Sequence, residues 1–390
     1  MTEQKNFPSD YKVGVLGGGQ LGKMLALAAA NWGIPFHVLD ASPDFPAGPY
    51  CTHFTEGSFK DFDDVYNFGK GKDVVTIEIE HVNTKALLQL EKEGVTVHPS
   101  PTALNIIKDK GLQKQFYKDK GLATSEFRLY DSESEVLAAL SEGEIIYPFV
   151  QKSRTAGYDG KGVAVIKNSS DKSKILKGAC IVEPLVDIDK EIAVSVARNE
   201  KGEVVAYPAV EMEFDERANL VDFLFCPANI SKEIAEQAEA MAKATIDAYD
   251  MCGLLAVELF LTKSGDLLIN EVAPRTHNSG HHTIDSCITS QFEMQLLAIL
   301  NLPLGSTRIT SPSVMVNLLG AEGFTGPAVY EGMSECLQIP GAKFHLYGKS
   351  ITKPFRKMGH ATVVDEDLEV AKQNAIRLRD GLRIVSREER

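Results

Sequence analysis

The sequence lacks several patterns that would mark a membrane, secreted or metal-clustered protein. No apolar run approaches the roughly 20 residues that a membrane-spanning helix needs, and the polar start, Met1–Asp10, has no apolar core of a secretory signal. The six cysteines include no C-x-x-C pair, which argues against a zinc site and a disulfide framework. Positive charge is also scarce, and the net charge of −13 argues against nucleic acid and anionic membranes as partners. We therefore expect a cytoplasmic protein with reduced thiols.

The chain has the composition of a globular protein with more than one domain. It contains 390 residues, of which 44% are hydrophobic and 24% charged, and this length favours two or three domains. Strands alternate with helices in residues 1–101, which predicts an α/β fold with a doubly wound parallel sheet. Residues 102–305 are predicted to form an α+β domain with antiparallel sheets, including a helical segment at 104–120 and a strand at 145–152. Residues 306–390 are predicted to form a small β-rich unit that ends in a helix.

A glycine-rich turn follows the first predicted strand. Residues 17–22 spell Gly-Gly-Gly-Gln-Leu-Gly, which matches G-x-G-x-x-G, and Asp40 lies at the end of the next strand. This pattern is typical of nicotinamide-dinucleotide sites, but what it supplies physically is a tight turn with backbone amides at a helix start, which binds any phosphate. Close packing of a strand on a helix also explains the glycines. A dinucleotide, another phosphate and packing alone all remain possible interpretations at this point.

A second glycine-rich segment lies between two predicted strands. Residues 157–162 spell Gly-Tyr-Asp-Gly-Lys-Gly and come shortly after Lys152 and Arg154. Such a loop can fold its amides over a triphosphate, with Lys161 as the counter-charge. The segment is not a P-loop, because the G-K-[ST] ending is absent, and an ordinary hairpin turn is the alternative. Lys152 ends an apolar strand, where a lysine needs an anionic partner that a nucleotide phosphate would supply.

Two acidic residues are predicted to face each other on a hairpin. Strands at 254–261 and 266–271 are joined by a short turn and carry Glu258 and the pair Asn270-Glu271. Facing carboxylates are costly to bury together, because like charges disfavour each other's ionised form. A Mg²⁺ ion held by these carboxylates and by substrate phosphates would remove that cost. The hairpin therefore predicts a magnesium-nucleotide site.

A polar run follows this hairpin directly. Arg275, His277 and Asn278 would point polar groups at whatever the metal-bound nucleotide activates. His277 and His281 also have the i, i+4 spacing of a metal-binding pair, but the glutamate oxygens nearby make a magnesium shell more natural than a zinc one. Hairpin and polar run together indicate phosphoryl transfer.

Two other segments are candidates for nucleotide and phosphate contacts. The strand that ends at residues 183–186, with Glu191 beyond it, can hold an adenine edge by main-chain hydrogen bonds and ribose hydroxyls by an acid. Surface glutamates are the plainer alternative. Near the C-terminus a basic cluster would hold a phosphate together with the turn at 17–22, unless it is simply a solvated face. Its members are Lys349, Lys353, Arg356 and Lys357.

These segments together resemble the ATP-grasp superfamily and, along almost the whole chain, the N5-carboxyaminoimidazole ribonucleotide synthetase family of purine biosynthesis. The matching stretches are GGGQLGKML (17–25), TIEIEH (76–81), GYDGKG (157–162), ELF (258–260), INEVAPRTHNSGH (269–281) and FRKMGH (355–360). The run at 269–281, combined with the loop at 157–162, is far more specific than either motif alone. The resemblance implies an N-terminal α/β domain (1–101), a central ATP-grasp domain (102–305) and a small β-rich C-terminal domain (306–390).

The resemblance also implies an ATP site with bound Mg²⁺. Glu258 and Glu271 would hold the metal. The chain departs from the family where Lys110 replaces a common arginine, so its phosphate contact would be a point charge, and near Phe214, where relatives often have a histidine. The residues implied in ATP binding are Lys110, Lys152, Gly157, Tyr158, Asp159, Gly160, Lys161, Gly162, Val163, Glu183, Pro184, Leu185, Val186, Glu191, Asn270 and Glu271.

The implied reaction is the ATP- and bicarbonate-dependent carboxylation of the exocyclic amine of 5-aminoimidazole ribonucleotide through carboxyphosphate. Asp159 would orient or deprotonate the amine, and Arg275, His277 and Asn278 would surround the bicarbonate. The implied partners are these small molecules, with no nucleic acid and no membrane, and the implied assembly is a homodimer. The residues implied in contact with the ribonucleotide are Gln20, Leu21, Glu78, Tyr158, Arg275, Lys353 and Arg356.

Three alternative functions remain open from the sequence. Another ATP-grasp ligase, such as a phosphoribosylglycinamide formyl-transferring enzyme, would also bind a ribonucleotide. A nicotinamide dehydrogenase would use residues 17–22 and Asp40 but leaves the acidic hairpin unexplained. A catalytically idle scaffold subunit would have no need of Lys152, Glu258 and Glu271.

Overall fold

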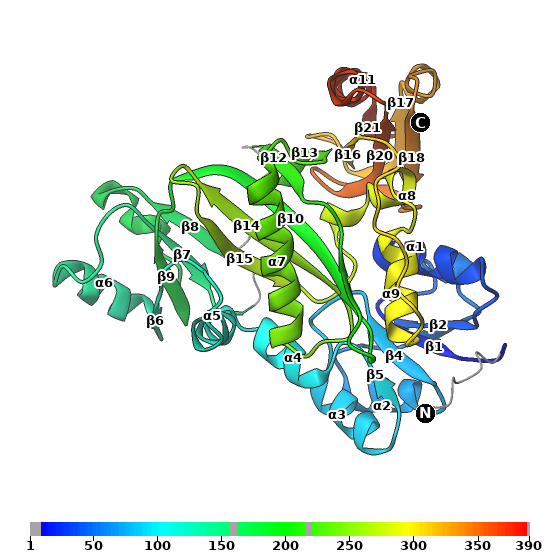
Figure 1. The fold of residues 1–390 in the computed structure, drawn as a ribbon, viewed down its shortest axis with the longest axis horizontal. Coiled ribbons are helices and arrows are strands. Elements are labelled where there is room, and N and C mark those ends of the chain that lie inside the picture. Colours follow the sequence, from blue (N-terminus) through cyan, green and yellow to red (C-terminus); the bar gives the residue numbers. More distant parts are fainter. Residues whose placement is uncertain (1–8, 156–161, 216–219, 388–390) are drawn as a thin grey trace.

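The structure is a computed structural model that describes residues 9–155, 162–215 and 220–387. These residues form an N-terminal α/β part, a central part built on two sheets, and a C-terminal lobe (Figure 1). The predicted architecture of three parts is confirmed. None of the helices in these ranges combines the length and the apolar composition that crossing a bilayer requires.

The N-terminal part is a parallel sheet in the order β3-β2-β1-β4-β5. The chain adds strands on one side of β1 and then returns to add β4 and β5 on the other, so the predicted doubly wound sheet is confirmed. In such sheets ligands bind beyond the carboxyl ends of the strands where the order reverses, here β1 and β4. The elements are β1 (Val13–Leu16), α1 (Gln20–Ala30), β2 (Phe36–Asp40), η1 (Gly48–Tyr50), β3 (His53–Glu56), α2 (Phe62–Gly69), β4 (Val74–Ile77), α3 (Thr84–Lys92) and β5 (Thr96–Val97).

Two helices, α4 (Pro101–Ile107) and α5 (Lys110–Asp119), connect this part to the centre, where the sequence predicts one helical segment. The break is at Asp109, whose carboxylate oxygen Oδ1 accepts hydrogen bonds from the amides of Gly111 (2.8 Å) and Leu112 (3.1 Å) and so caps a new helix. Lys110 thereby becomes the first residue of α5.

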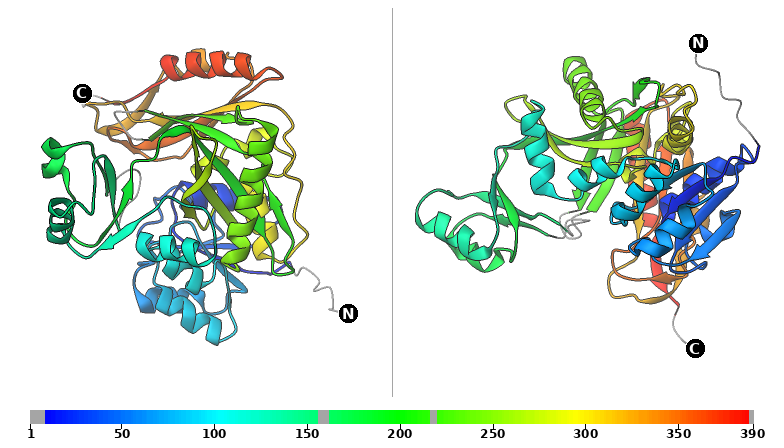
Figure 2. Two further views of the ribbon diagram at one scale, coloured as in Figure 1. Left: turned by 60° about the vertical axis from the view of Figure 1, so that its left-hand side comes forward. Right: turned by 90° about the horizontal axis from the view of Figure 1, so that it is seen from below.

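A small antiparallel sheet, in the order β6-β9-β7-β8, projects from one end of the molecule (Figure 2). The strand predicted at 145–152 begins only at Phe149, because Pro148 has no amide hydrogen to donate to a neighbouring strand. The elements are β6 (Arg128–Tyr130), α6 (Glu133–Ser141), β7 (Phe149–Ser153), β8 (Val163–Ile166), η2 (Ser169–Lys174) and β9 (Cys180–Pro184).

A larger antiparallel sheet joins the central part to the C-terminal lobe. Its order is β15-β14-β10-β12-β13-β16-β20-β18, with β11 beside β10. Helix α7 covers one face, where Ala238, Ala242 and Ile246 belong to one apolar cluster with residues of β10 and β14. The central elements are β10 (Ile188–Arg198), β11 (Val204–Ala206), β12 (Val210–Asp215), β13 (Leu220–Cys226), α7 (Lys232–Ala248), β14 (Gly253–Thr262), β15 (Leu267–Ala273), η3 (Asn278–Gly280), α8 (Thr283–Ser286) and α9 (Gln291–Ile299).

The C-terminal lobe shares this larger sheet and adds a small one. Strands β16, β20 and β18 continue the sheet from β13, while β19, β17 and β21 form a three-stranded sheet of their own. The predicted boundaries at 101 and 305 stay predictions. The elements are β16 (Ser313–Leu319), β17 (Gly326–Glu331), α10 (Met333–Cys336), β18 (Ala342–Leu346), β19 (Ile351–Thr352), β20 (Lys357–Val364), α11 (Leu368–Gly381) and β21 (Arg383–Ser386).

One apolar cluster holds parts of all three regions together. Leu21 of α1, Phe292 of α9 and Tyr347 of the C-terminal lobe are all buried in it. The ammonium of Lys23 adds a polar tie, because its Nζ donates to the carbonyl of Leu346 at 2.7 Å. Burial of side chains of this size contributes about 1.5–3 kcal/mol each. The start of α1, and with it the glycine-rich turn, is therefore fixed against the C-terminal lobe.

Buried histidines line the same junction. The rings of His281 and His345 each lie 4.6 Å from the ring of His360, measured between centroids. His282 is also buried, with Nδ1 2.9 Å from Oγ of Ser286. Burial lowers the pKa of His281 and His360 far below the ordinary value and lowers the pKa of His282 to about 3. At neutral pH these three rings are uncharged.

We predict that these histidines make the fold sensitive to acid. The pKa of His282 is lower in the folded chain than in the unfolded chain, so its contribution to stability is complete above pH 6.5 and is lost as the pH falls toward 3. Replacing His282→Gln should remove about 1.4 kcal/mol per pH unit from the dependence of the unfolding free energy on pH between 6 and 4. Urea unfolding at a series of pH values measures this slope. The exposed His53→Gln is the control and should keep the wild-type slope; an equal slope in both variants would contradict the prediction.

Candidate functional site

Glu258 and Glu271 face each other across β14 and β15, as the sequence predicts. They are direct partners in the strand register, just before a bulge between Glu258 and Leu259. Burial and the carboxylates of Glu271 and Glu191 raise the pKa of Glu258 to about 8, so this group holds a proton at neutral pH. Burial opposes ionisation of Glu271 as well, but its ion pair with Lys110 outweighs burial and lowers its pKa to about 2. The two acids together therefore carry a single negative charge.

This pair of acids suits a divalent cation. The raised pKa of Glu258 indicates that a second negative charge is disfavoured beside Glu271, and a bound cation would offset that cost. Asn270, beside Glu271, contributes an amide oxygen to the same region. Among the described residues no group of three or more His, Cys, Asp or Glu side chains is placed to hold a metal. Mg²⁺ commonly takes only one or two carboxylates and completes its shell with substrate phosphates and water.

The carboxylate of Glu183 is held inside the protein by two lysines. Lys152 Nζ lies 2.8 Å from Oε2, and Lys114 Nζ lies 2.5 Å from Oε1, which also accepts a hydrogen bond from the Ser125 hydroxyl at 2.9 Å. Glu183 is only 3% exposed. A ribose therefore cannot reach this carboxylate, and a nucleotide contact at Glu183 would have to come from its main chain. Lys114 is not among the residues that the sequence singles out; its place four residues after Lys110 on one helix is the available signal.

The other residues predicted to contact adenosine lie at the end of β9 and on β10. Pro184 and Leu185 are exposed at the end of β9, and Val186 is half-buried. Glu191 lies on β10, and burial raises its pKa. Phe214 packs against an apolar cluster, so its side chain supplies no polar contact for a nucleotide.

The glycine-rich loop at 157–162 lies almost entirely outside the described residues. The predicted roles of Gly157, Tyr158, Asp159, Gly160 and Lys161 fall there. Its end is described. The carbonyl of Gly162 accepts a hydrogen bond from the amide of Ser153 at 2.8 Å, and Val163 pairs with Lys152 across β7 and β8. The loop therefore connects two paired strands, β7 and β8, and β7 carries Lys152.

Two carboxylates of the protein occupy amides of the turn after β1. Glu78 accepts hydrogen bonds from the amides of Gly19 (2.5 Å) and Gly22 (2.6 Å), and Asp40 accepts one from the amide of Gly18 (2.7 Å). Asp40 is also buried. A dinucleotide pyrophosphate would need these amides, and its ribose would need the carboxylate of Asp40. The structure therefore contradicts the dinucleotide interpretation of this motif.

Glu78 also explains why glycines are needed in this turn. A Cβ atom at Gly17 would lie 2.4 Å from Cγ of Glu78, and one at Gly19 would lie 2.6 Å from its Oε1. Gly17 in addition has φ of +108°, which other residues rarely adopt. Between the two amides that Glu78 occupies, the amides of Gln20 and Leu21 have no acceptor among the described residues. Any phosphate at this turn would bind there.

The polar run after β15 is tied into the protein by Arg275. Its Nη2 lies 2.7 Å from Glu80 and its Nη1 donates to the carbonyl of Thr276 at 3.0 Å, while its buried Nε has no partner in the described part of the chain. His277 lies close to the acidic pair, with Nε2 3.9 Å from Oε1 of Glu258. The structure thus brings His277 to the predicted metal site and leaves one N–H of Arg275 unused.

The next residue of this run, Asn278, is locked by a second amide. Asn278 and Asn317 exchange hydrogen bonds between their side chains, at 2.8 Å and 3.1 Å, which joins the run to β16. His281 is 1% exposed, and its Nδ1 lies 2.9 Å from the side-chain amide of Gln291. The structure contradicts the alternative in which His277 and His281 form a metal-binding pair, because His281 is enclosed in the histidine stack.

Lys353 and Arg356 of the basic cluster lie on the connection between β19 and β20, while Lys349 precedes β19 and Lys357 begins β20. Phe355 has φ of +61°, and its amide donates to the carbonyl of Gly320 at 2.8 Å. A non-glycine residue in this conformation costs of order 1 kcal/mol and persists only where its surroundings hold it. Arg356 is half-buried, with Nη1 bound to the carbonyl of Ile351 (2.6 Å), and Lys353 is exposed. The turn therefore presents two cations from one fixed backbone.

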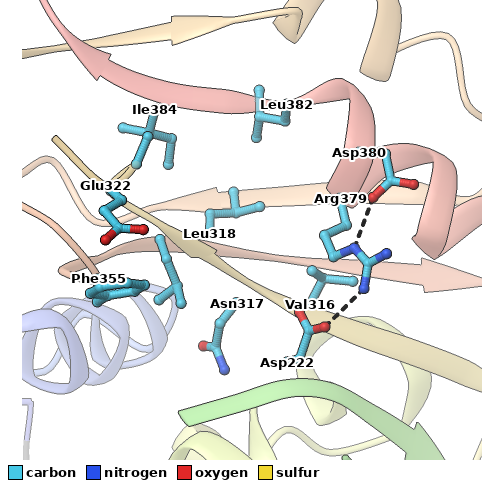
Figure 3. Close-up of a pocket in the computed structure, with 13 residues that line it drawn as sticks. Asp222, Val316, Asn317, Leu318, Glu322, Phe355, Arg379, Asp380, Leu382 and Ile384 are labelled. Atoms are coloured by element: carbon cyan, nitrogen blue, oxygen red, sulfur yellow. Dashed lines mark hydrogen bonds and ion pairs between the residues drawn. The ribbon is translucent and has the colours of Figure 1, made fainter. Parts of the chain in front are cut away.

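A cavity of about 430 Å³ lies between the larger sheet and α11 (Figure 3). Arg379 on its wall pairs with Asp222 and Asp380, both at 2.9 Å. Asn317 lies on the wall as well, and Asn278 is bonded to it. None of the predicted site residues that the structure describes lines this cavity, so it is separate from the acidic pair Glu258 and Glu271.

Comparison with protein families assigns each part of the chain. Residues 11–108 match the ribonucleotide synthetase preATP-grasp domain, residues 115–292 match the ATP-grasp domain, and residues 313–374 match the phosphoribosylaminoimidazole carboxylase C-terminal domain. The chain is 37% identical over 368 residues to the phosphoribosylaminoimidazole carboxylase of Ogataea methanolica, covering 91% of this chain and 67% of that protein. It spans about two thirds of the length of such carboxylases.

Two solved structures share the fold over nearly their full length. The N5-carboxyaminoimidazole ribonucleotide synthetase of Thermotoga maritima has a TM-score of 0.89 at 44% identity and covers 97% of this chain and 100% of that one. An Aspergillus clavatus N5-carboxyaminoimidazole synthase, solved with ADP and 5-aminoimidazole ribonucleotide, has a TM-score of 0.87 at 34% identity and covers 95% and 99%. The chain therefore belongs to the N5-carboxyaminoimidazole ribonucleotide synthase family of ADP-forming ATP-grasp ligases.

Proposed function

We propose that this chain carboxylates the exocyclic amine of 5-aminoimidazole ribonucleotide in purine biosynthesis, with bicarbonate as the carbon source and ATP as the second substrate. Bicarbonate oxygen attacks the γ-phosphorus, the bond to ADP breaks, and carboxyphosphate forms. The amine nitrogen then attacks the carbonyl carbon, phosphate leaves with the electrons of the C–O bond, and the nitrogen loses a proton. The observation that carries this proposal is the facing pair Glu258 and Glu271, flanked by Lys110 and Lys152.

The phosphate end of ATP is assigned to the cleft around that pair. Lys110 and Lys152 would contact the phosphates from opposite sides, while Glu258 and Glu271 would hold Mg²⁺ with Asn270 beside them. When bound, the cation neutralises charge on the β- and γ-phosphates as the phosphoryl group moves. The adenosine end would lie against the exposed end of β9, at main-chain groups of residues 183–186, with the carboxylate of Glu191 at the ribose.

The bicarbonate would bind between the acidic pair and the run that follows β15. The buried Nε of Arg275 has no acceptor among the described residues, and a guanidinium can hold carboxyphosphate oxygens at two points. His277, 3.9 Å from Glu258, is placed to donate to an oxygen near the metal. Asn278, fixed by Asn317, completes this shell. These groups would stabilise the negative charge that develops on the carbonyl oxygen of carboxyphosphate when the amine attacks its carbon.

The ribonucleotide would lie between the N-terminal turn and the C-terminal lobe. The free amides of Gln20 and Leu21, at the start of α1, suit its 5′-phosphate, together with Lys353 and Arg356. Glu78 stands at the same turn and would face the sugar or base. Tyr158 and Asp159 lie outside the described residues, and their roles toward the amine stay predictions from the sequence.

We also assign the enzyme to the cytoplasm, as a homodimer, with no nucleic-acid or membrane partner. The decisive experiment measures ADP release on addition of bicarbonate, with and without 5-aminoimidazole ribonucleotide. The proposal requires bicarbonate-dependent ADP release and transfer of labelled bicarbonate carbon into the ribonucleotide product. If ADP release required formate and a glycinamide ribonucleotide instead, the proposal would be wrong and the chain would be a formyl-transferring ATP-grasp enzyme.

We predict that Glu271→Gln abolishes catalysis but not folding. The neutral amide cannot balance Mg²⁺ or the ammonium of Lys110, so bicarbonate-dependent ADP release should fall by more than about 100-fold. Steady-state assays with saturating substrates measure this loss, and circular dichroism checks the fold. The control is Glu236→Gln on the exposed side of α7, which should retain wild-type turnover. Turnover retained by Glu271→Gln would remove the proposed metal role.

We predict that Arg356→Ala weakens the binding of 5-aminoimidazole ribonucleotide but not the binding of ATP. Loss of a charged hydrogen bond of about 1.5–3 kcal/mol corresponds to a rise in the KM for 5-aminoimidazole ribonucleotide of roughly 10- to 150-fold. The KM for ATP should stay within twofold of wild type. Arg128→Ala, in the small projecting sheet, is the matched control and should change neither constant. Equal effects of Arg356→Ala on both constants would refute the placement of the phosphate.

A further inference from the structure

We propose that Lys114 is a positioning residue of the ATP site. It binds one carboxylate oxygen of Glu183 and balances the negative charge of that group, so that Glu183 can orient Lys152 while Lys152 still attracts the triphosphate. This inference rests on the proposed function only for the identity of the nucleotide. Lys114 lies on α5, one helical turn after Lys110, and is 2% exposed. A side chain so deeply enclosed cannot contact a substrate, so its effect on ATP would pass through its neighbours.

The hydrogen-bond donors of Lys114 are fully used within the protein. A lysine ammonium has three N–H donors, and this one binds Oε1 of Glu183 (2.5 Å), Oγ1 of Thr124 (2.6 Å) and Oγ of Ser125 (2.8 Å). Burial lowers the pKa of Lys114 to about 8, opposed by the charge of Glu183. The pairing keeps the lysine charged at neutral pH even though it is buried.

Lys152 differs from Lys114 in having one N–H donor for which the described residues supply no hydrogen-bond acceptor. Its Nζ binds Oε2 of Glu183 (2.8 Å) and Oδ1 of Asn270 (2.9 Å), which accounts for two of its three N–H groups. Both protein partners are fixed, so the third N–H has a defined direction. A phosphate oxygen would be its natural acceptor. Glu183 thus orients Lys152, and Lys114 in turn orients Glu183.

The charges in this network show why one glutamate is shared by two lysines. Lys114, Lys152 and Glu183 together carry a net charge of +1, and this charge would attract phosphates bound beside Lys152. Without the charge of Lys114, Glu183 and Lys152 would form a neutral one-to-one pair, and the attraction of Lys152 for phosphate would weaken. Lys114 therefore adds positive charge to the ATP site from a position that ATP cannot reach.

The same network fixes the two sheets relative to each other. The hydroxyl of Thr124, which accepts from Lys114, donates to the carbonyl of Ile269 on β15 at 2.6 Å, and the amide of Ile269 donates to the carbonyl of Ala123 at 2.8 Å. Asn270 is the next residue on that strand. Lys114 on α5 is thereby connected to both β9, which carries Glu183, and β15, which carries the predicted metal ligand. Stability alone would not call for an ion pair here, since buried pairs are often replaced by apolar residues without loss.

The test is Lys114→Met in the full-length chain, which keeps the volume and removes the charge. We expect the Kd for a non-hydrolysable ATP analogue with Mg²⁺, measured by calorimetry, to rise roughly tenfold or more, as for a lost charged hydrogen bond. The KM values for bicarbonate and the ribonucleotide should stay within twofold. Lys118→Met, on the exposed side of the same helix, is the matched control and should bind the analogue like wild type.

A double-variant cycle separates positioning from simple loss of structure. If Lys114 acts through Glu183, then Lys114→Met should add no more than twofold to the Kd of Glu183→Gln. Multiplicative effects in the double variant, or an unchanged Kd in Lys114→Met, would overturn the proposal. If Lys114→Met does not fold, the comparison of Glu183→Gln with the double variant, which has no charged carboxylate to leave unpaired, still decides. Analogue binding is independent of turnover, so an enzyme with no bicarbonate-dependent activity would disprove the proposed function without affecting this test.

Discussion

Charge balance at the hairpin of β14 and β15 is the constraint on which the rest of the site depends. The strand register places Glu258 directly opposite Glu271, and the protein alone can stabilise only one negative charge between them. Lys110 pairs with Glu271, and its attraction for Glu258 is outweighed by burial and by the neighbouring carboxylates, so the pKa of Glu258 stays raised. A cation bound by both acids would complete the balance, and it would bring substrate phosphates as further ligands. Facing acids of this kind cost stability unless a positively charged group balances them.

This requirement extends into the three elements around the hairpin. Lys110 and Lys114 come from α5, Lys152 and Glu183 from the small sheet, and Glu271 from the large one. The small sheet projects from the molecule (Figure 2). Thr124, in the segment that leads into this sheet, is hydrogen-bonded to Ile269 on β15 and so ties the segment to the hairpin. A nucleotide between the sheets would therefore bind groups whose positions are set by hydrogen bonds to both of them.

Local patterns in the sequence predict the elements of this site, but not how distant segments pair. The alternation of strands and helices predicts the parallel sheet, and the short turn between two apolar strands predicts the facing of Glu258 and Glu271. Strands β12 and β13 were not predicted, nor was the continuation of the large sheet into the C-terminal lobe, because pairing between β13 and β16 joins residues about ninety positions apart. The sequence does not predict the role of Lys114 for the same reason. Its partner Glu183 is nearly seventy positions away, and only the fold brings the two residues together.

The turn after β1 shows how the same glycine pattern can serve a different ligand. The sequence motif fixes where amides point, but the group bound to them depends on Glu78, which arrives from the end of β4. Once its carboxylate fills the space over Gly17 and Gly19, a pyrophosphate cannot enter, and the open amides shift to Gln20 and Leu21 at the start of α1. A helix start still favours a single anion there. One carboxylate thus removes the dinucleotide interpretation of this motif, and the proposed contact with a ribonucleotide 5′-phosphate depends on the two remaining amides.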